Sequence, residues 1–544
     1  MNTTSLSIAQ RLGLQPIDTP RKPRINLKTP SITKLATAIT QNIPAHAILR
    51  RGEDYLTVTR STTPAKLGHF PPIVRALSST RFCSLSEQWL HYADGADEDA
   101  KQASLTKQKA EQILASDAFY NATAELDLIA EVRLPIWGDT VDGRRSIILS
   151  TPGYNPTNHT LTVESINYTH TFTQLDAGTI RHAFDSIFRH FPWAPEQKFE
   201  ARTIWQVEPG TFHTGPQPSK NRSACVLLAL MLGQYCRLLI NRLPMAIVNG
   251  NQPGTGKSLL AWFLIAPVWG MAATAAKPTS DEELIKYLNT VTQARKPFAL
   301  LDDISTLASN AINMFATAPL IEGRKMGTDQ LFTTINRTQI ICTGNALATT
   351  PDIERRSMIV DLFFDEAATD RSIPTPLEPQ DLAEASMRAD LLQLLWSLVK
   401  NWSDAGCPTL VDGSKSKASY EGFAEVVGSI LLHNGFSNPF ARRTITHSGG
   451  DLRGRALESL IIKLADLMQT ETHTYDLGDV IKSAEAHGYL EILCSGKDAR
   501  KSLGRQLSKL RGRKFKDSKG TPFIFGADKD AYSSKYTFTY NSNL

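Results

Sequence analysis

Paired cysteines and long apolar runs are both scarce in this sequence. Only 6 of the 544 residues are cysteine, and no two have the spacing of a zinc knuckle or a redox pair, which argues against a cysteine-based metal site and favours a reducing compartment. The most apolar stretch, 225–240, is interrupted by Gly233, Gln234 and Arg237, and residues 1–40 contain no apolar segment of signal-peptide length. We therefore expect a cytoplasmic protein without a membrane span.

Net charge is also low, at +5, but it is unevenly distributed. Residues 1–50 contain seven lysines and arginines against Asp18 alone, and residues 497–519 contain ten against two aspartates. The remainder of the chain is therefore acidic. An acidic body with two basic ends predicts contact with a polyanion at those ends.

The most informative stretch follows a short apolar strand over 245–249 and precedes an apolar helix. Glycines let consecutive backbone N–H groups point at phosphates, a lysine reaches the β- and γ-phosphates, and a hydroxyl at the helix start binds Mg²⁺. The sequence therefore predicts a site for ATP and Mg²⁺. Its nucleotide-binding residues are Asn251, Gln252, Pro253, Gly254, Thr255, Gly256, Lys257, Ser258 and Leu259. Position 251 carries Asn where the strict pattern has Gly, and Asn tolerates a positive φ, so the turn remains feasible.

Two carboxylates, Asp302 and Asp303, end the next apolar strand, over 298–301. In a parallel sheet, a Mg²⁺-binding aspartate and a water-polarising carboxylate belong at the carboxyl end of the strand beside the phosphate loop. We assign Asp302 to the metal, together with Ser258, and Asp303 to the attacking water. Two carboxylates that merely cap the next helix are the alternative.

Polar residues also end the two strands that follow. A strand over 338–342 leads to Asn345, whose amide would orient the water, although a lone Asn after a strand is usually a turn former. Arg355 and Arg356 precede a strand over 358–362. An arginine there would act on the γ-phosphate of a neighbouring subunit, and a salt-bridged surface helix is the alternative.

Together these residues resemble the AAA+ ATPases, with Walker A at 251–258, Walker B at 298–303, sensor 1 at Asn345 and an arginine finger at Arg355 or Arg356. Within that class the chain is similar to the superfamily-3-like DNA helicases of phages, plasmids and integrative mobile elements. Four further segments carry this closer resemblance: Pro135-Ile136-Trp137, residues 151–156, Phe191-Pro192-Trp193 and Met326-Gly327-Thr328.

The resemblance implies an ATP-dependent replicative helicase that translocates on single-stranded or forked DNA as a homo-oligomeric ring of six subunits. It also implies a prokaryotic or phage-infected cell and a primase-polymerase encoded elsewhere. A hairpin over 322–337 would project into the channel, with Arg324, Lys325 and Arg337 on DNA phosphates; a polar surface hairpin is the alternative. The other functional hypothesis is a replication initiator or DNA-remodelling ATPase, including one of defence or transposition, without processive unwinding.

The carboxyl end, from residue 457 on, has the order of three short helices and a hairpin, which suits a winged helix. Leu503, Leu507 and Leu510 would face its core. The basic residues on the outer side of the third helix and at the start of the wing would then contact duplex DNA. These are Arg500, Lys501, Arg505, Lys509, Arg511 and Lys514. A solvated basic helix, or a winged helix that contacts protein, is the alternative.

The predicted fold class is α/β, with an AAA+ core of parallel sheet, flanking helices and a helical lid. We expect five segments along the chain. They are a basic flexible arm over 1–45, an α+β domain over 46–215, the ATPase core over 216–375, a helical lid and linker over 376–450, and a winged-helix domain over 451–544.

Overall fold

The computed structural model describes most of the chain. The described residues are 22–61, 72–97, 99–139, 145–164, 173–194, 204–208, 211–214, 219–270, 278, 280–324, 330–345, 347–364, 377, 381–441, 452–467, 474–486, 499–508, 510–512, 514–517, 521–529 and 534–540. None of the helices within these ranges is long and apolar enough to cross a membrane.

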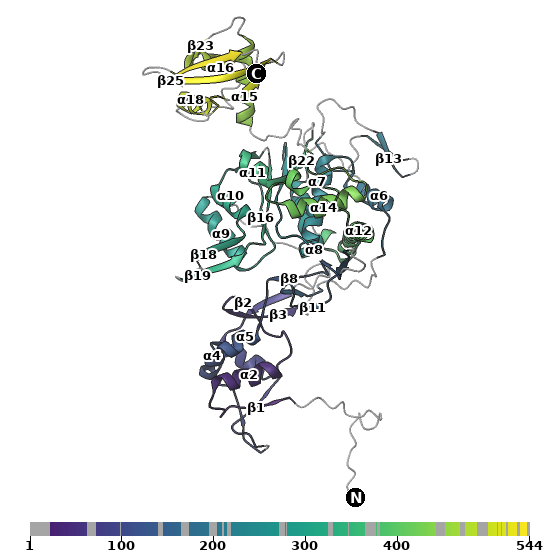
Figure 1. The fold of residues 1–544 in the computed structure, drawn as a ribbon, viewed down its shortest axis with the longest axis vertical. Coiled ribbons are helices and arrows are strands. Elements are labelled where there is room, and N and C mark those ends of the chain that lie inside the picture. The colour runs from purple at the N-terminus through teal and green to yellow at the C-terminus, as the bar shows by residue number, and fades with distance from the viewer. Residues whose placement is uncertain are drawn as a thin grey trace.

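A four-stranded parallel sheet lies at the centre of the middle part of the molecule (Figure 1). Its strands, in spatial order, are β16 (Phe298–Leu301), β20 (Gln339–Asn345), β15 (Met245–Gly250) and β22 (Ser357–Leu362). All three pairings are parallel. Because such strands are covered on both faces, they occur as nearly continuous apolar runs. The prediction of an α/β fold with a parallel sheet is confirmed.

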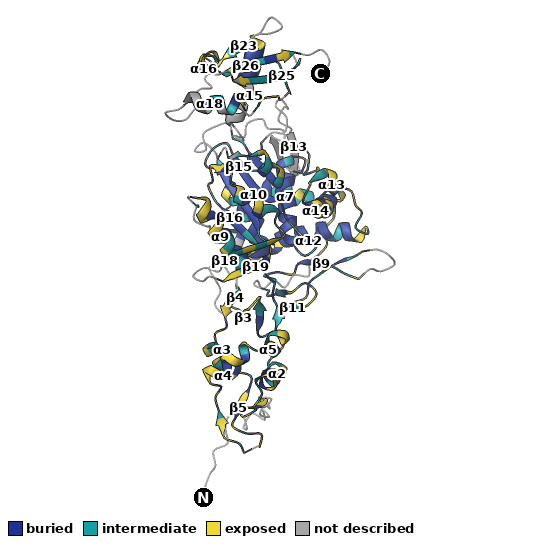
Figure 2. Ribbon diagram, turned by 60° about the vertical axis from the view of Figure 1, so that its left-hand side comes forward, coloured by how far each residue is buried: buried dark blue, intermediate teal, exposed yellow. Residues whose placement is uncertain are grey.

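Helices cover both faces of this sheet. Alternate residues of a strand point to opposite faces, so Val248 and Val360 lie in one core and Ile247 and Ile359 in the other. The helices that contribute to the first core are α6 (Ala177–Phe188), α7 (Arg222–Tyr235), α8 (Lys257–Trp269), α12 (Ala385–Asp404) and α14 (Glu421–His433). Those of the second are α9 (Asp281–Gln293), α10 (Asn310–Thr317) and α11 (Pro351–Arg356). Figure 2 shows the buried interior of this three-layered arrangement in dark blue.

The helices expected to form a lid are present, but they belong to the first layer. Helix α12 packs against α8, and α14 packs against both α7 and α12. Their apolar spacing predicts helices with one buried side. The spacing does not show that these buried sides pack against α7 and α8, because that depends on the tertiary fold.

The first core extends across the expected boundary at 215/216. Helix α6 and the side chains of Phe191 and Trp193 share one cluster with α7 and α8. This segment also pairs with the sheet edge, because Trp193 bridges Leu362 in antiparallel fashion and the Phe363 N–H donates to the Pro192 carbonyl at 2.8 Å. Described residues between Leu128 and Trp193 therefore contribute to the core that supports the parallel sheet.

A separate core lies nearer the N-terminus, and it corrects one expectation. Ile25, Leu35 and Ile39 are buried in it, so the flexible arm predicted over 1–45 is wrong from residue 22 onward; residues 1–21 lie outside the described part of the chain. Strand β1 (Arg24–Asn26) and helix α2 (Ile32–Asn42) occupy this segment. The prolines at 23, 30 and 44 lie just outside these two elements, where a missing N–H costs little.

The other elements of the N-terminal region are short. They are β2 (Leu49–Arg51), β3 (Asp54–Arg60), β4 (Pro72–Ala76), α3 (Ser79–Ser86), β5 (His91–Ala93), β6 (Gln102–Ala103), α4 (Lys107–Leu114), α5 (Asp117–Ala122), β7 (Ala124–Glu125), β8 (Leu128–Ala130), β9 (Pro135–Trp137), β10 (Ile147–Leu149), β11 (Gly153–Asn155), β12 (Thr160–Thr162), β13 (Ile204–Glu208) and β14 (Thr211–Thr214).

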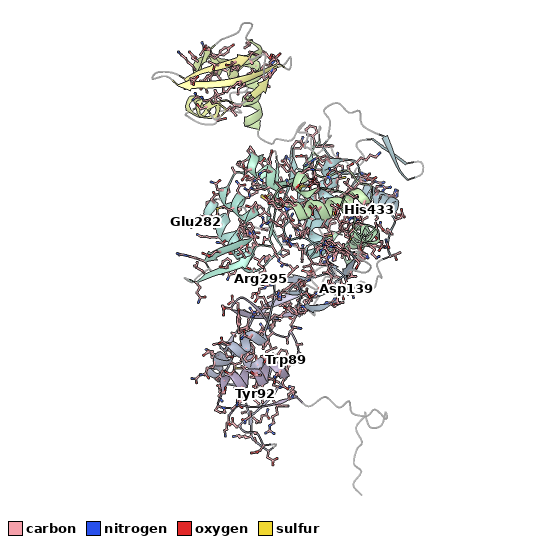
Figure 3. All side chains as sticks on the ribbon, viewed as in Figure 1. Trp89, Tyr92, Asp139, Glu282, Arg295 and His433 are labelled. Carbon is pink, nitrogen blue, oxygen red and sulfur yellow. The ribbon has the colours of Figure 1, made fainter. Side chains whose placement is uncertain are left out.

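Charged side chains fasten the N-terminal region to the sheet layer. Arg295, which follows α9 with a left-handed φ of 51°, donates to Glu125 Oε1 at 2.7 Å and to the Leu126 carbonyl at 2.6 Å, and it also pairs with Asp127. Arg51 donates in the opposite direction, to a backbone carbonyl at the end of α9, at 2.9 Å. Figure 3 labels Arg295 at this junction. The contact fixes the turn that leads into β16.

The C-terminal elements enclose a core of their own. Leu503 and Leu507 are fully buried in it and Leu510 packs against it, as their spacing predicts. The elements are α15 (Leu452–Asp466), β23 (Thr474–Asp476), α16 (Leu477–Ala486), α18 (Ala499–Ser508), β24 (Lys514–Lys516), β25 (Pro522–Lys529) and β26 (Ser534–Tyr540). The strands form an antiparallel sheet in the order β23-β26-β25-β24.

One glycine of the central sheet tests this packing. A Cβ added at Gly344 in β20 would lie 2.3 Å from the Ile304 carbonyl oxygen. We predict that Gly344→Ala destabilises the protein by about 1–3 kcal/mol, because the backbone of one of the two segments must shift. The thermal midpoint, followed by circular dichroism, should fall accordingly.

The matched control is Gly422→Ala in α14. Only Ile240 Cγ2, at 4.0 Å, lies near the added methyl group there, and alanine is a better helix former than glycine. Its midpoint should equal or exceed that of the wild type. A Gly344→Ala protein as stable as this control would contradict the packing described for β20.

Candidate nucleotide-binding site

The loop between β15 and α8 is held in a tight turn by glycine. Gly254 has a φ of 79°, and Gly256, the residue before the first turn of α8, has a φ of 95°. Residues with a side chain rarely adopt such φ values. At Gly250 an added Cβ would lie 2.5 Å from Thr255 Oγ1. The loop therefore folds back closely over the end of its own strand.

Lys257 points into this turn and not into solvent. Its side chain is buried, and Nζ donates to the Gln252 carbonyl at 3.0 Å and to Thr255 Oγ1 at 3.3 Å. Burial lowers the pKa of Lys257, an effect opposed by the negative charges of Asp303 and Asp302. A buried ammonium whose hydrogen-bond acceptors are uncharged is suited to receive an anionic group within the loop.

The Asp302 carboxylate connects three elements of the site. Ser258 Oγ, in the first turn of α8, donates to Asp302 Oδ1 at 3.1 Å. Thr343 Oγ1, in β20, donates to the same oxygen. The Ser258 hydroxyl and the Asp302 carboxylate, both assigned to the metal, are thus in contact at the carboxyl side of the sheet, although β20 lies between β15 and β16.

Asp303 and Asn345 also meet at this edge. Asp303 has a φ of 54°, a strained value for a residue with a side chain, and its N–H donates to Thr343 Oγ1 at 3.0 Å. Asn345 Nδ2 donates to Asp303 Oδ1 at 3.4 Å. The Asn345 Oδ1 atom is buried and has no hydrogen-bond partner in the described part of the chain. A water molecule that bridges the two groups would satisfy it.

The Asn at position 251 has a different role from the one anticipated. It is not among the described residues with a positive φ. Its side-chain amide instead pairs with the backbone of Phe364, which follows β22: Nδ2 donates to the carbonyl at 2.8 Å, and Oδ1 accepts from the N–H at 3.1 Å. Gln252 Nε2 donates to the same carbonyl at 2.8 Å. These amides anchor the loop to the neighbouring strand.

The other residues assigned to the nucleotide lie in the loop and in the first turn of α8. Pro253 and Ser258 are exposed, Thr255 is buried, and Leu259 is partly buried against the first core.

The two candidate arginines differ in their surroundings. Arg355 and Arg356 both pair with Asp352 at 3.1 Å, which lowers the pKa of that carboxyl. Arg356 also donates to Thr317 Oγ1 at 2.6 Å, and its side chain is only 16% exposed, whereas that of Arg355 is 51% exposed. Of the pair, Arg355 is therefore the one that is accessible to another molecule.

The arginines lie near the amino ends of the parallel strands, whereas the phosphate loop lies at their carboxyl ends. Met245 is level with Ser357, and Gly250 is level with Leu362. Five residues of strand separate the two levels, which corresponds to about 16 Å. Arg355 comes before the first level and the loop after the second.

The candidate DNA contacts are only partly described. The hairpin consists of β18 (Leu320–Arg324) and β19 (Leu331–Ile335), with Arg324 exposed at the end of β18 and Lys325 outside the described residues. Arg337 is not at the tip; it lies beyond the foot of β19, 3.8 Å from Asp127 Oδ2. Arg337 is therefore shared with the junction to the N-terminal region.

The C-terminal candidates are placed mainly through their backbone. Arg500, Lys501 and Arg505 lie in α18, and Lys514 begins β24. Arg511 is exposed and pairs with Asp528 at 2.8 Å. Lys509 lies outside the described residues.

Thr343 is the site residue that sequence reasoning did not identify. Its hydroxyl donates to Asp302 and accepts from the Asp303 N–H. The sequence signal that could have identified it was its position near the carboxyl end of a buried strand, two residues before Asn345. That signal acquires meaning only when β20 is known to pair with β16.

The described residues contain no cluster of three or more histidine, cysteine or acidic side chains that could hold a metal ion. A divalent cation at Ser258 and Asp302 would thus need further ligands from a bound molecule. This is the usual arrangement for Mg²⁺, which proteins bind through one or two carboxylates together with substrate phosphates.

Comparisons with known proteins give structural neighbours only. No protein-family model matches the chain, and no curated protein matches it. Among solved structures, the apo form of the NrS-1 C-terminal region is 9% identical with a TM-score of 0.34, over 89% of this chain and 96% of that one. The SCCmec type IV Cch protein, described as an active helicase, is 9% identical with a TM-score of 0.29, over 92% of this chain and 98% of that one. At these values the function must be argued from the chain's own residues.

The shared Asp302 contact leads to a prediction. Thr343→Val keeps the side-chain shape but removes the hydroxyl that holds Asp302 and Asp303. We expect the apparent Mg²⁺ affinity to fall about tenfold, as is usual when a group that orients a metal ligand is lost. The measurement is a Mg²⁺ titration of the binding of a fluorescent ATP analogue.

Thr338→Val is the matched control. Thr338 precedes the same strand, and its hydroxyl donates to the Lys296 carbonyl at 2.8 Å, at the edge of the sheet away from the loop. This variant should titrate like the wild type. Equal Mg²⁺ affinities for Thr343→Val and Thr338→Val would remove Thr343 from the site.

Proposed function

We propose that the chain is an ATP-dependent DNA helicase of the AAA+ class, similar to the superfamily-3-like helicases of mobile elements, and that it works on DNA as a hexameric ring. The observation that carries this proposal is the assembly at the carboxyl edge of the sheet. Ser258 and Asp302 are in contact there, Asp303 and Asn345 are in contact beside them, and Lys257 is buried in the preceding loop.

Each of these side chains has a role in the proposed hydrolysis of ATP. Lys257 would exchange its loop acceptors for the β- and γ-phosphates, and Ser258 and Asp302 would hold Mg²⁺. When bound, Mg²⁺ neutralises charge on the phosphates. Asp303 would take a proton from the attacking water, and Asn345 would orient that water. The unsatisfied Asn345 Oδ1 atom supports this assignment, because it leaves an acceptor free for the water.

The distance between the two edges of the sheet supports action between subunits. Arg355 is about 16 Å along the strand direction from the loop of its own chain, and it is half exposed. An arginine so placed can complete a site only on another copy of the chain. This is the physical basis for proposing a ring with ATP between the subunits.

DNA would be bound at two places. The hairpin formed by β18 and β19 would contact a single strand in the channel. Helix α18, with Arg500, Lys501 and Arg505 along it, would enter the groove of duplex DNA. Cationic side chains in such numbers make the binding strongly dependent on salt.

The decisive experiment is strand displacement on a forked DNA substrate. The wild-type chain with Mg²⁺ and ATP should displace the labelled strand, and Lys257→Ala should bind no nucleotide and displace nothing. ATP turnover that DNA stimulates but that displaces no strand would contradict the helicase and favour an initiator or remodelling ATPase. ATP turnover left intact in Lys257→Ala would refute the nucleotide site itself.

The two arginines allow a separate test of the ring. Arg355→Ala should abolish turnover alone, and mixing it with Lys257→Ala should restore part of it, because some interfaces then combine an intact loop with an intact arginine. Confirmed mixed assemblies without recovery would assign Arg355 a structural role.

Arg356→Ala is the comparison. Because Arg356 holds Thr317 in the same chain, its loss should lower the thermal midpoint, and mixing should not correct this loss of stability. Turnover should be measured alongside the thermal midpoint for each variant.

A further inference from the structure

A buried arginine lies near the amino ends of the strands of the central sheet, and it has no counterion in the described part of the chain. Arg237, just after α7, is only 5% exposed. Its Nη2 donates to the Pro297 carbonyl at 3.1 Å, and its buried Nη1 has no hydrogen-bond partner among the residues that the structure describes. No carboxylate within the described residues forms an ion pair with it. Burial and the positive charge of Arg337 lower its pKa to about 9, which leaves it protonated at neutral pH.

The environment of Arg237 is cationic. A small cavity is lined by the three arginines Arg237, Arg242 and Arg337 together with Asn336 and Thr338. The other two arginines each interact with an acidic residue: Arg337 lies 3.8 Å from Asp127, and Arg242 lowers the pKa of the exposed Glu421, after the larger effect of backbone hydrogen bonds. Neither carboxylate forms an ion pair with Arg237. Burying a charge in this way is costly unless an anion joins it.

The cavity is small and lies next to the hairpin. It offers about 10 Å³ to the centre of a water-sized group, which is close to the space of one oxygen atom. A ligand must therefore present a single anionic oxygen from outside. Asn336 and Arg337 directly follow β19, and the foot of the hairpin exposes two apolar side chains close by, Leu320 at 55% and its strand partner Ile335 at 49%.

We propose that this cavity binds one phosphodiester group of a single DNA strand that runs past the foot of the hairpin. Guanidinium groups beside exposed apolar side chains match the two parts of single-stranded DNA, which are the charged backbone and the flat faces of the bases. The phosphate oxygen accepts from Arg237 Nη1, and Arg242 and Arg337 neutralise the rest of its charge. The inference deepens the proposed function and rests on its DNA-binding part.

Arg237→Met in the full-length chain tests the site, because methionine fills a similar volume without charge. Binding of a fluorescent oligo-dT should weaken about tenfold, and the slope of log affinity against log salt should become shallower by about 0.7, the value for one phosphate contact. The thermal midpoint without DNA should not fall, because an uncompensated buried charge has been removed. A lower midpoint with unchanged DNA affinity and slope would overturn the proposal.

Two further variants support the reading. Arg242→Gln, at the half-exposed rim, should also weaken binding and reduce the slope, which keeps the test open if Arg237→Met does not fold. Arg75→Gln removes one exposed charge on β4, away from the cavity, and should leave affinity and slope unchanged. Equal effects from Arg75→Gln and Arg242→Gln would reduce the cavity to general surface charge and refute the site.

A last comparison distinguishes a free phosphate ion from a phosphodiester group of DNA as the ligand. Inorganic phosphate at constant ionic strength should raise the midpoint of the wild type but not of Arg237→Met. If phosphate stabilises the wild type while the oligo-dT affinity of Arg237→Met is unchanged, a free anion and not a DNA strand occupies the cavity. If Arg237→Met changes only self-association, the ligand is a carboxylate of another subunit. Because these assays need no ATP turnover, they remain readable if the helicase proposal fails.

Discussion

The Asp302 carboxylate is the point on which the candidate site depends. It accepts hydrogen bonds from Ser258 at the start of α8 and from Thr343 at the end of β20, and so joins a loop, a helix and two strands that are distant in sequence. Thr343 in turn accepts from the Asp303 N–H, which supports the left-handed backbone of Asp303 and its contact with Asn345. Loss of this one carboxylate would leave Ser258 and Thr343 without their common partner.

The parallel sheet gives the two edges of the molecule's central part different chemistry. Loops after the strands converge on the carboxyl edge, and there they collect hydroxyl, carboxylate and amide groups suited to phosphate and a cation. The segments before the strands, which include helix α11, carry cations instead: Arg237, Arg295, Arg337 and Arg355. The first edge fits a nucleotide, and the second fits partners that carry negative charge, which include the acidic residues Glu125 and Asp127 of the chain's own N-terminal region.

Sequence alone predicted the parts of the candidate site that are local in the chain. The candidate phosphate loop could be predicted because a glycine turn, Lys257 and Ser258 are contiguous, and Asp302 because it follows an apolar strand. The role of Thr343 was not readable, since it arises from the pairing of β16 with β20. Arg337 was predicted to contact DNA because the family resemblance implies a DNA-binding hairpin over 322–337, yet it lies beyond the end of β19 and Asp127 lies beside it. The prediction of a flexible arm over 1–45 was wrong from residue 22 onward, because the number of prolines does not show whether they interrupt a helix or strand or flank it.

The junction with the N-terminal region bears on how the site can change shape. Arg295 immediately precedes the segment that enters β16, and Arg337 precedes β20. These are the two strands whose far ends carry Asp302, Asp303 and Asn345. Because both strands are packed between two helical layers, they can shift only together with their neighbours. If the N-terminal region moves and the contacts of Arg295 with Glu125 and Asp127 are kept, the amino end of β16 must move with it. Otherwise these contacts must break. The two strands of the site are held at both ends: the hydrogen bonds of Thr343 to Asp302 and Asp303 join their carboxyl ends, and Arg295 and Arg337 contact the N-terminal region at their amino ends.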